Sequence, residues 1–404
     1  MSFDQISLFK QKLKTSLDDI DPQAIGIIKR LKESSFDGYI VGGAVRDLLV
    51  GLKPKDFDIA TNALPNEVKK RVPYCFIIGR RFKLVHARRG EKIFEIATYR
   101  REAKPEELST EVGIDLPFVE ENFFGNLQED SFRRDFTVNA LFYDPTNEEL
   151  IDFCGGLNDI QSQTLRMIGD PSERIKEDPV RILRAIRLSQ KLTFQLESSL
   201  REAILVNAEE IQKGVLPRRR EEWIKFFRLP NIESALWDLF DLEIFKQVMP
   251  SLHELFQNEN QREEFLCYIR RISHIGFDFN DQVELFAAII YSYLLATHDH
   301  YLKINARDLA DDKKFQSFCK DELGVFKAEM ISIEMTFQHI HNLSKKESYL
   351  TKGERRQKAF LNNPHFNLAM KLGLLSGELS SADFDFWMSE KERHQQSPPQ
   401  NSSL

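Results

Sequence analysis

The stretch VGGAVRDLLVGLKPKDFDIA, residues 41–60, decides the fold of the chain around it. An apolar run that ends at Val41 predicts a buried strand, and Ala44–Val50 predicts a short helix. Between them, Gly42 and Gly43 let backbone N–H groups come close to an anion, and the N-terminus of the helix adds partial positive charge. The segment therefore predicts a strand–turn–helix unit that can hold a phosphate group.

Charged side chains on the same stretch fit a bound nucleotide. Arg46 lies one turn into the predicted helix, within reach of the same anion. Asp56 and Asp58 are two residues apart, so in a strand both carboxylates point to one face while Phe57 points to a core. Two carboxylates beside a phosphate site are what Mg²⁺ needs to hold a nucleoside triphosphate. Either motif alone is usually structural, but their succession in one strand–helix–strand unit indicates nucleotide chemistry.

The order GGAVRD and then KDFDIAT resembles the class II nucleotidyltransferase superfamily, which includes CCA-adding enzymes and bacterial poly(A) polymerases. The resemblance implies an α/β nucleotidyltransferase head, with a small mixed sheet and flanking helices, followed by an all-α neck, body and tail. It implies that Gly42, Gly43 and Arg46 position a triphosphate. It also implies that Asp56 and Asp58 are catalytic and bind the metal.

The bulk properties narrow the class of protein. The chain has 404 residues and a net charge of −7, so any RNA contact must come from local basic patches. Its four cysteines are scattered without a CxxC pair, which argues for a reducing compartment and against zinc or a disulfide framework. The N-terminus lacks a signal-peptide apolar region, and Leu285–Ala296 is too short to cross a bilayer and predicts a buried helix. We expect a cytoplasmic protein without membrane contact.

An acid stands among apolar neighbours in Lys92–Tyr99, KIFEIATY. The alternation predicts a strand with Phe94 and Ile96 on one face and Glu95 on the other. Because a buried unpaired carboxylate is costly, Glu95 either lies at an exposed edge or serves the metal site. In the family that this chain resembles, an acid at the matching position completes a carboxylate triad. The resemblance therefore implies Glu95 as the third carboxylate.

A second block follows the acidic residues 101–130, which predict a mobile loop. Residues 133–141 read RRDFTVNAL, and two arginines beside an aspartate alone suggest a surface ion pair. The whole block resembles the second motif of the family. That resemblance implies that Arg134 holds phosphate and that Asp135 contacts ribose hydroxyls or supports the metal site. Cys154–Asp159 resembles the third motif, D…GGxxD, and we interpret it as a structural joint.

Pro171–Gln190, PSERIKEDPVRILRAIRLSQ, predicts a helix with an arginine every three residues. Such a stripe is usually a solvated face, and steps of three keep Arg181, Arg184 and Arg187 on that face. The string EDPVRILRAIR resembles the fourth motif of the family, which implies that Asp178 and Arg181 read the incoming base and that the later arginines bind the nucleotide. Adenine and cytosine both present an amino donor beside a ring-nitrogen acceptor, so this motif does not separate A-adding from C-and-A-adding enzymes.

The rest of the chain predicts amphipathic helices, with their aromatic residues in the core. Pro217–Trp223, PRRREEW, stands in place of the family's fifth motif, but the match is loose and a basic cluster at a helix start explains it. We expect a catalytic head, a neck that binds nucleotide and RNA, a helical RNA-binding body and tail, and a disordered end, at residues 1–165, 166–230, 231–390 and 391–404. Two further blocks, IIGRRFKLVH at 77–86 and GERRQKAFLNNPHFNLAMKLGLL at 353–375, resemble bacterial poly(A) polymerases. The strongly basic tail common in those enzymes is missing.

Together these features predict a template-independent polynucleotide adenylyltransferase, which adds AMP from ATP to RNA 3′-OH ends in RNA tailing and decay. The resemblance implies two Mg²⁺ ions, with Mn²⁺ as a substitute, and ATP as substrate. Its expected partners are RNA 3′ ends, with RNA-decay proteins as candidates, and we expect a monomer. The first alternative is a tRNA CCA- or A-adding enzyme. The second, a catalytically silent RNA-binding paralogue, is disfavoured because no motif carboxylate is missing.

Overall fold

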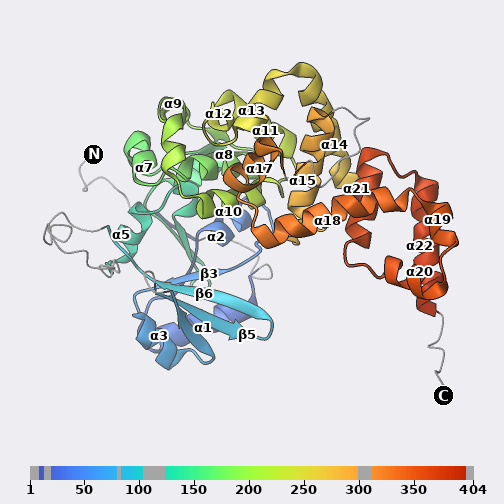
Figure 1. Ribbon diagram of the computed structural model, residues 1–404. Coiled ribbons are helices and arrows are strands. Elements are labelled where there is room, and N and C mark those ends of the chain that lie inside the picture. Colours follow the sequence, from blue (N-terminus) through green and yellow to red (C-terminus); the bar gives the residue numbers. More distant parts are fainter. Residues whose placement is uncertain are drawn as a thin grey trace, which may run out of the picture. The chain divides into compact units, whose positions relative to one another are not determined.

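The computed structural model describes residues 9–12, 20–79, 83–102, 123–298, 309 and 311–396. The chain divides into two compact units, one made of residues 1–177 and 192–204 and the other of residues 178–191 and 205–404. The first unit contains a mixed sheet with flanking helices, and the second is helical (Figure 1). This architecture confirms the predicted fold class.

In the described part of the first unit, eight strands form one sheet in the order β1-β8-β7-β2-β3-β6-β5-β4. The strands are β1 (Phe9–Lys12), β2 (Tyr39–Val41), β3 (Asp58–Thr61), β4 (Cys75–Ile78), β5 (Leu84–Arg89), β6 (Lys92–Thr98), β7 (Leu141–Asp144) and β8 (Glu149–Asp152). The pair β3–β6 is parallel and the other neighbours are antiparallel. β1 was not predicted, because a short polar strand at a sheet edge leaves no alternation to detect.

Helices α1 (Pro22–Glu33), α2 (Gly43–Leu49) and α3 (Pro65–Arg71) cover one face of this sheet; Figure 1 shows α1 and α3 on one side of β3, β5 and β6. α1 begins as predicted, with the Asp21 carboxylate accepting from the N–H of Gln23. The core beneath these helices includes Ile40, Ile59 and Ile96. In each central strand, the face that carries these alternating apolar residues is therefore the face buried beneath the helices.

The remaining described elements of the first unit follow β6 in the sequence. They are α5 (Leu127–Phe132), η3 (Thr137–Asn139), α6 (Gly156–Gln161), β9 (Thr164–Leu165), α7 (Pro171–Glu177), β10 (Gln195–Leu196) and α9 (Ser198–Val206). A small cluster that includes Val41, Ala60 and Phe142 is buried on the second face of the sheet. As the alternation of β6 predicted, Phe94 and Ile96 are buried while Ile93 and Glu95 are exposed. The second face of the sheet thus carries both apolar residues and carboxylates.

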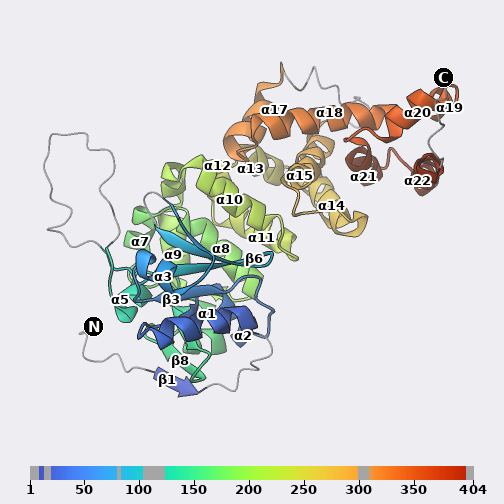
Figure 2. The ribbon, with the colours of Figure 1, turned by 90° about the horizontal axis from the view of Figure 1, so that it is seen from below.

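The second unit contains helices throughout its described residues. They are α8 (Arg181–Leu192), η4 (Ala208–Lys213), α10 (Leu216–Phe226), α11 (Ile232–Asp241), α12 (Ile244–Val248), α13 (Pro250–Gln257), α14 (Glu259–Ile275), α15 (Gln282–Thr297), α17 (Lys313–Ser317), η5 (Phe318–Glu322), α18 (Lys327–Leu343), α19 (Lys346–Leu350), α20 (Glu354–Leu361), α21 (Phe366–Ser376) and α22 (Ser381–Gln396). α14, α15, α18 and α21 pack against one another (Figure 2). All twelve residues of Leu285–Ala296 are buried within α15, as predicted. Among the described helices, none is long and apolar enough to cross a membrane.

The end of the chain departs from the prediction. Residues 391–404 were expected to be disordered, but α22 continues to Gln396; residues 397–404 lie outside the described residues. The helix is anchored because Trp387 is fully buried in an aromatic cluster and the hydroxyl of Tyr349 donates to Glu390 at 3.0 Å. The polar composition of this segment therefore gave the wrong prediction. The contacts that anchor its helix, at Trp387 and Glu390, lie before the polar run begins.

Candidate functional site

Two predicted carboxylates lie side by side on the second face of the sheet. Asp58, the first residue of β3, pairs with Val41 of β2. On its other side, Ile59 pairs with Ile96 in parallel register, which brings Asp58 next to Glu95 of β6. Cross-strand neighbours point to the same face, so these two carboxylates share one surface.

The neighbouring charges shift the pKa of Asp58. Desolvation and the nearby Glu95 carboxylate raise the pKa of Asp58 to about 6; Asp56 acts in the same direction, and the guanidinium of Arg134 opposes them. Phe57 packs against the core on the opposite face, as predicted, and Asp58 keeps part of its surface in solvent. The prediction that Asp56 lies within the strand is wrong, because β2 ends at Val41 and offers no partner before Asp58.

The donor set fits a magnesium-bound nucleotide better than a metal held by protein alone. Among the residues that the structure describes, no three His, Cys, Asp or Glu side chains form a group that could hold a metal ion. Mg²⁺ is usually bound by one or two carboxylates, with phosphate oxygens and waters as its other ligands. Asp56 and Asp58 meet that requirement, and the role of Glu95 as third carboxylate stays a prediction.

The glycine turn lies against two arginines. Gly42 adopts a φ of +73° and precedes α2, as the strand–turn–helix prediction requires. A Cβ at Gly42 would lie 3.5 Å from Nη1 of Arg134, and one at Gly43 would lie 3.4 Å from Nη2 of Arg46. The turn therefore leaves room for guanidinium groups beside the backbone, in the region where a phosphate was predicted to bind.

Arg134 is oriented by a buried aspartate that the sequence analysis did not identify. Asp130 is 2% exposed; it accepts from Nε and Nη2 of Arg134 at 3.2 and 2.8 Å, and from Nε of Arg133 at 2.9 Å. Burial raises the pKa of Asp130, but the two arginines outweigh it and hold that pKa below its usual value. Arg134 also lies over the ring of Phe142, 5.1 Å from its centroid.

The loop prediction for residues 101–130 is wrong at its C-terminal end. Residues 103–122 lie outside the described residues, but α5 begins at Leu127. Its start is a capping box: Asn126 Oδ1 accepts from the N–H of Glu129, and Glu129 Oε2 accepts from the N–H of Asn126. This N-x-x-E pattern was the available signal for a helix that carries Asp130.

Arg46 has different partners from those expected of a phosphate ligand. Its guanidinium is buried and donates to Asp47 Oδ1 at 2.9 and 2.7 Å and to Asn139 Oδ1 at 2.5 Å. Asn139 in turn donates from Nδ2 to Asp135 Oδ1 at 3.1 Å. Arg46 thereby orients Asp135 through Asn139, a residue within the RRDFTVNAL block to which we had given no role. Direct contact of Arg46 with phosphate stays a prediction.

Arg174 of α7 fixes the backbone of the second motif. Its Nη2 donates to the carbonyls of Arg133 and Arg134 at 2.8 and 3.1 Å, and its Nη1 donates to Glu102 and Glu177. These bonds explain why the first compact unit continues to residue 177, past the head boundary predicted at residue 165.

The third motif is a structural joint, as interpreted. The Asp152 carboxylate accepts from four successive N–H groups, those of residues 154–157. A Cβ at Gly156 would lie 2.3 Å from the carbonyl oxygen of Thr137, so this position requires glycine. Thr137 donates from its hydroxyl to Asp159 at 2.7 Å. The joint therefore anchors the turn that follows Arg134 and Asp135.

A hollow of about 560 Å³ opens beside Asp56. Its lining includes Lys53, Lys55 and Lys92, together with Ile93 of β6. Lys92 reaches Asp21 at 2.6 Å. The lining also contains the acids Asp21 and Glu91, so positive and negative side chains lie together beside Asp56.

The predicted arginine stripe lies in the second unit and forms as expected. Arg181, Arg184 and Arg187 are half-buried along one face of α8, while Ile182 and Leu183 are fully buried on the other. The helix predicted from Pro171 divides at Asp178–Val180, where Asp178 accepts from the N–H of Val180 at 3.3 Å, as an N-cap of the second half would, and Pro179 cannot continue the backbone hydrogen bonding of α7.

Helix α10 supplies the partners of this stripe. Glu222, 3% exposed, accepts from Arg187 Nε at 2.6 Å and lies 3.7 Å from Nη1 of Arg184. Arg218 donates to both oxygens of Asp178, at 2.9 and 2.7 Å. The match of Pro217–Trp223 to the fifth motif was loose. The segment nevertheless contacts three of the four residues that the fourth motif assigns to base and nucleotide binding.

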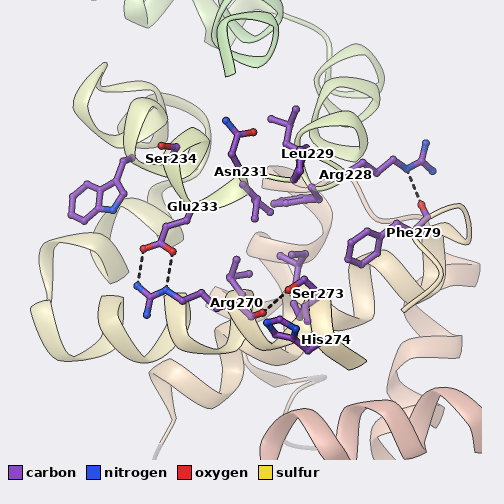
Figure 3. Close-up of a pocket in the computed structure, with 16 residues that line it drawn as sticks. Arg228, Leu229, Asn231, Glu233, Ser234, Arg270, Ser273, His274 and Phe279 are labelled. Atoms are coloured by element: carbon purple, nitrogen blue, oxygen red, sulfur yellow. Dashed lines mark hydrogen bonds and ion pairs between the residues drawn. The ribbon is translucent and has the colours of Figure 1, made fainter. Parts of the chain in front are cut away.

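A further cavity, of about 720 Å³, lies in the second unit between residues 227–237 and α14 (Figure 3). Glu233 and Arg270 form a two-point ion pair at its side, at 2.7 and 2.8 Å. His274 and Phe279 belong to its lining. None of the predicted site residues lines this cavity, so it does not belong to the nucleotide chemistry described above.

Comparison with protein families matches two segments of the chain. Residues 38–166 match the model described as the poly A polymerase head domain. Residues 193–256 match the model described as a probable RNA and SrmB-binding site of polymerase A. The first match contains every predicted site residue of the sheet unit, and the second contains Arg218 and Glu222.

The chain also resembles curated proteins in sequence and solved structures in fold. The chain is 36% identical over 244 residues to poly(A) polymerase I of Salmonella typhi, covering 60% of this chain and 52% of that protein. It is 34% identical over 232 residues to the CCA-adding enzyme of Lactobacillus helveticus, covering 57% and 56%. The chain thus spans about half the length of the curated relatives it matches. The fold resembles the Bacillus stearothermophilus CCA-adding enzyme in complex with CTP, with a TM-score of 0.55, 22% identity and coverage of 93% and 99%.

Proposed function

We propose, for a chain whose residues 38–166 belong to the poly(A) polymerase head-domain family, that it transfers AMP from ATP to RNA 3′-OH ends without a template. The observation that carries this proposal is the acidic cluster of the sheet: the register of β3 and β6 sets Asp58 beside Glu95, and the charges of Glu95, Arg134 and Asp56 all act on Asp58. Like charges held together are destabilising unless a cation joins them, so the cluster is suited to a divalent metal.

In this proposal, different residues of the chain have different roles in nucleotidyl transfer. Asp130 holds Arg134 beside the glycine turn, where its guanidinium can neutralise the phosphates of ATP. Asn139 orients Asp135, which is placed to accept from a ribose hydroxyl. Asp56 and Asp58 would hold two Mg²⁺ ions, which at such a site lower the pKa of the RNA 3′-hydroxyl and neutralise the leaving pyrophosphate. The 3′ oxygen attacks the α-phosphorus in line, and the bond from that phosphorus to the β-phosphate oxygen breaks.

Selection of the base is assigned to the second unit. A carboxylate and a guanidinium, from Asp178 and Arg181, match the amino donor and ring-nitrogen acceptor of adenine. The bidentate bond from Arg218 supports this role because it fixes the plane of the Asp178 carboxylate. Cytosine presents the same pattern, and the similarity to a CCA-adding enzyme supports CCA or A addition to tRNA as the second candidate function.

An incorporation assay tests the proposal. Wild-type protein, Mg²⁺ and one labelled nucleoside triphosphate at a time are incubated with a generic RNA and with tRNA lacking its CCA end. Long A tails on the generic RNA support poly(A) addition, and addition that stops after CCA on tRNA supports the second candidate. Asp56→Asn should lower incorporation by at least about a thousandfold with fold and ATP affinity retained. Glu33→Gln, at an exposed acid near the end of α1, is the matched control; equal activity in the two variants would overturn the assignment.

A further inference from the structure

A group of apolar side chains lies in solvent on the second face of the sheet. Phe76 is 61% exposed, Ile93 is 55% exposed and Ile78 is 37% exposed. Their strand neighbours Cys75 and Phe94 are buried in the core on the opposite face. Buried and exposed residues therefore alternate along β4, β5 and β6 as in an ordinary strand. The side that faces solvent nevertheless carries apolar residues. We call Phe76, Ile78, His86, Arg88 and Ile93 the open strand face.

The open strand face continues directly from the acidic cluster. Glu95 pairs with His86 of β5, and His86 pairs with Phe76 of β4. His86 Nε2 lies 3.3 Å from Glu95 Oε1. Neighbouring strands are about 5 Å apart, so the ring of Phe76 stands roughly 10 Å from Glu95, along the row that also contains Asp58.

A cationic side chain, Arg88, accompanies the apolar side chains. Arg88 pairs with Ile93 across β5 and β6, is exposed, and donates from Nε to the carbonyl of Gly90 at 3.1 Å. Lys92 does not belong to this face, because it alternates with Ile93 and reaches Asp21 beside α1. An aromatic ring and apolar residues beside an exposed arginine, in line with the carboxylates proposed to bind metal, match a single-stranded nucleic acid, whose bases stack and whose phosphates need positive charge.

We propose that the open strand face binds the last few nucleotides of the RNA acceptor, with Phe76 stacking on a base and Arg88 meeting a phosphate. The row from Phe76 to Asp58 then leads the 3′-hydroxyl toward the carboxylates. This inference rests on the proposed function, since it assigns the path of its RNA substrate. A protein strand added to the free edge of β4 is the competing occupant.

Binding of a fluorescent short oligoadenylate, followed by anisotropy without ATP, tests the proposal apart from catalysis. Phe76→Ala should weaken binding about tenfold or more, because stacking of one base on an aromatic ring has that effect. Phe76→Tyr, which keeps the ring, should bind like wild type. Leu64→Ala removes apolar surface that is 43% exposed elsewhere in the same unit and is the matched control. Arg88→Ala should reduce the slope of log affinity against log salt by about 0.7, as expected for one phosphate of a single strand.

The kinetics provide a second readout. In Phe76→Ala the KM for RNA should rise, while the KM for ATP and the rate at saturating RNA stay near wild type. Equal RNA affinity in Phe76→Ala and Leu64→Ala would overturn the inference, as would a Phe76→Tyr variant as weak as Phe76→Ala. An inactive wild type that still loses RNA affinity on Phe76→Ala would overturn the proposed function and support RNA binding at this face.

Discussion

Two carboxylates, one in each compact unit, have opposite electrostatic surroundings. Asp58 lies at the exposed start of β3, and desolvation together with Glu95 raises its pKa to about 6. Glu222 is buried in α10; its burial raises the pKa, but Arg187, Lys225 and Arg184 outweigh this effect and the pKa lies below its ordinary value. One acid is thus surrounded mainly by other acids, and the other is surrounded by cations.

The difference fits the metal site proposed at Asp58 and a structural role for Glu222. Glu222 is satisfied by protein, since Arg187 and Lys225 donate to it at 2.6 and 2.9 Å. Burying such a carboxylate is tolerated because its charge is paired and hydrogen-bonded. Asp58 is close to like charges, an arrangement that a fold retains where a cation is to bind. Neutralising Glu222 should therefore lower the stability of the fold, whereas neutralising Asp58 should leave it unchanged or raise it.

The largest expected effect comes from removing Glu222. Glu222→Ala leaves Arg187 half-buried without its carboxylate partner, and we expect α8 and α10 to lose about 3 kcal/mol of local stability. Native-state hydrogen exchange of the amides in these two helices measures that loss directly, without requiring the two units to unfold together.

Asp58→Asn is the matched control for this prediction. It removes a charge that Glu95 and Asp56 repel, so the protection of β3 amides should stay unchanged or rise while AMP incorporation is lost. A similar loss of protection in both variants would show that the two carboxylates are equivalent supports of the fold, and the comparison would fail.

Acid should erase the stabilising effect of Glu222. Its folded pKa lies below the unfolded value, so its contribution is complete above the unfolded pKa and is lost as pH falls toward the folded pKa. We therefore expect the difference in hydrogen-exchange protection between wild type and Glu222→Gln to be constant near neutral pH and to shrink below about pH 4.5. A difference that persists unchanged into acid would contradict the assignment of this stability to the charge of Glu222.

Periodicity and local motifs made much of the sheet unit predictable. Alternation placed Glu95 opposite Phe94 and Ile96, and the glycine turn placed Gly42 before α2. Steps of three placed the arginines of α8 on one face. Each of these inferences uses residues a few positions apart, whose relative directions follow from backbone geometry.

The hydrogen-bond partners of those residues were harder to predict, because most of them come from distant parts of the sequence. Asn139 lies 93 positions from Arg46, and Glu222 lies 35 positions from Arg187. Nothing in a single sequence says which carboxylate will meet which guanidinium once the helices pack. The same reason explains why the bond of Arg46 to Asn139 was not predicted, whereas its other partner, Asp47, is its neighbour in the sequence.

The smallest effect should come from Arg218, whose bond to Asp178 is half exposed. Arg218→Ala frees the Asp178 carboxylate, and exposed ion pairs contribute about 1 kcal/mol or less, so the stability of the second unit should barely change. If Asp178 reads the base, its loss of orientation should lower the ratio of kcat/KM for ATP over GTP by about fivefold to tenfold. Arg218→Lys should recover part of that ratio, because a lysine keeps the charge but cannot form the two-point bond. An unchanged ATP preference in Arg218→Ala would mean that α10 supports α8 as Glu222 does and takes no part in reading the base.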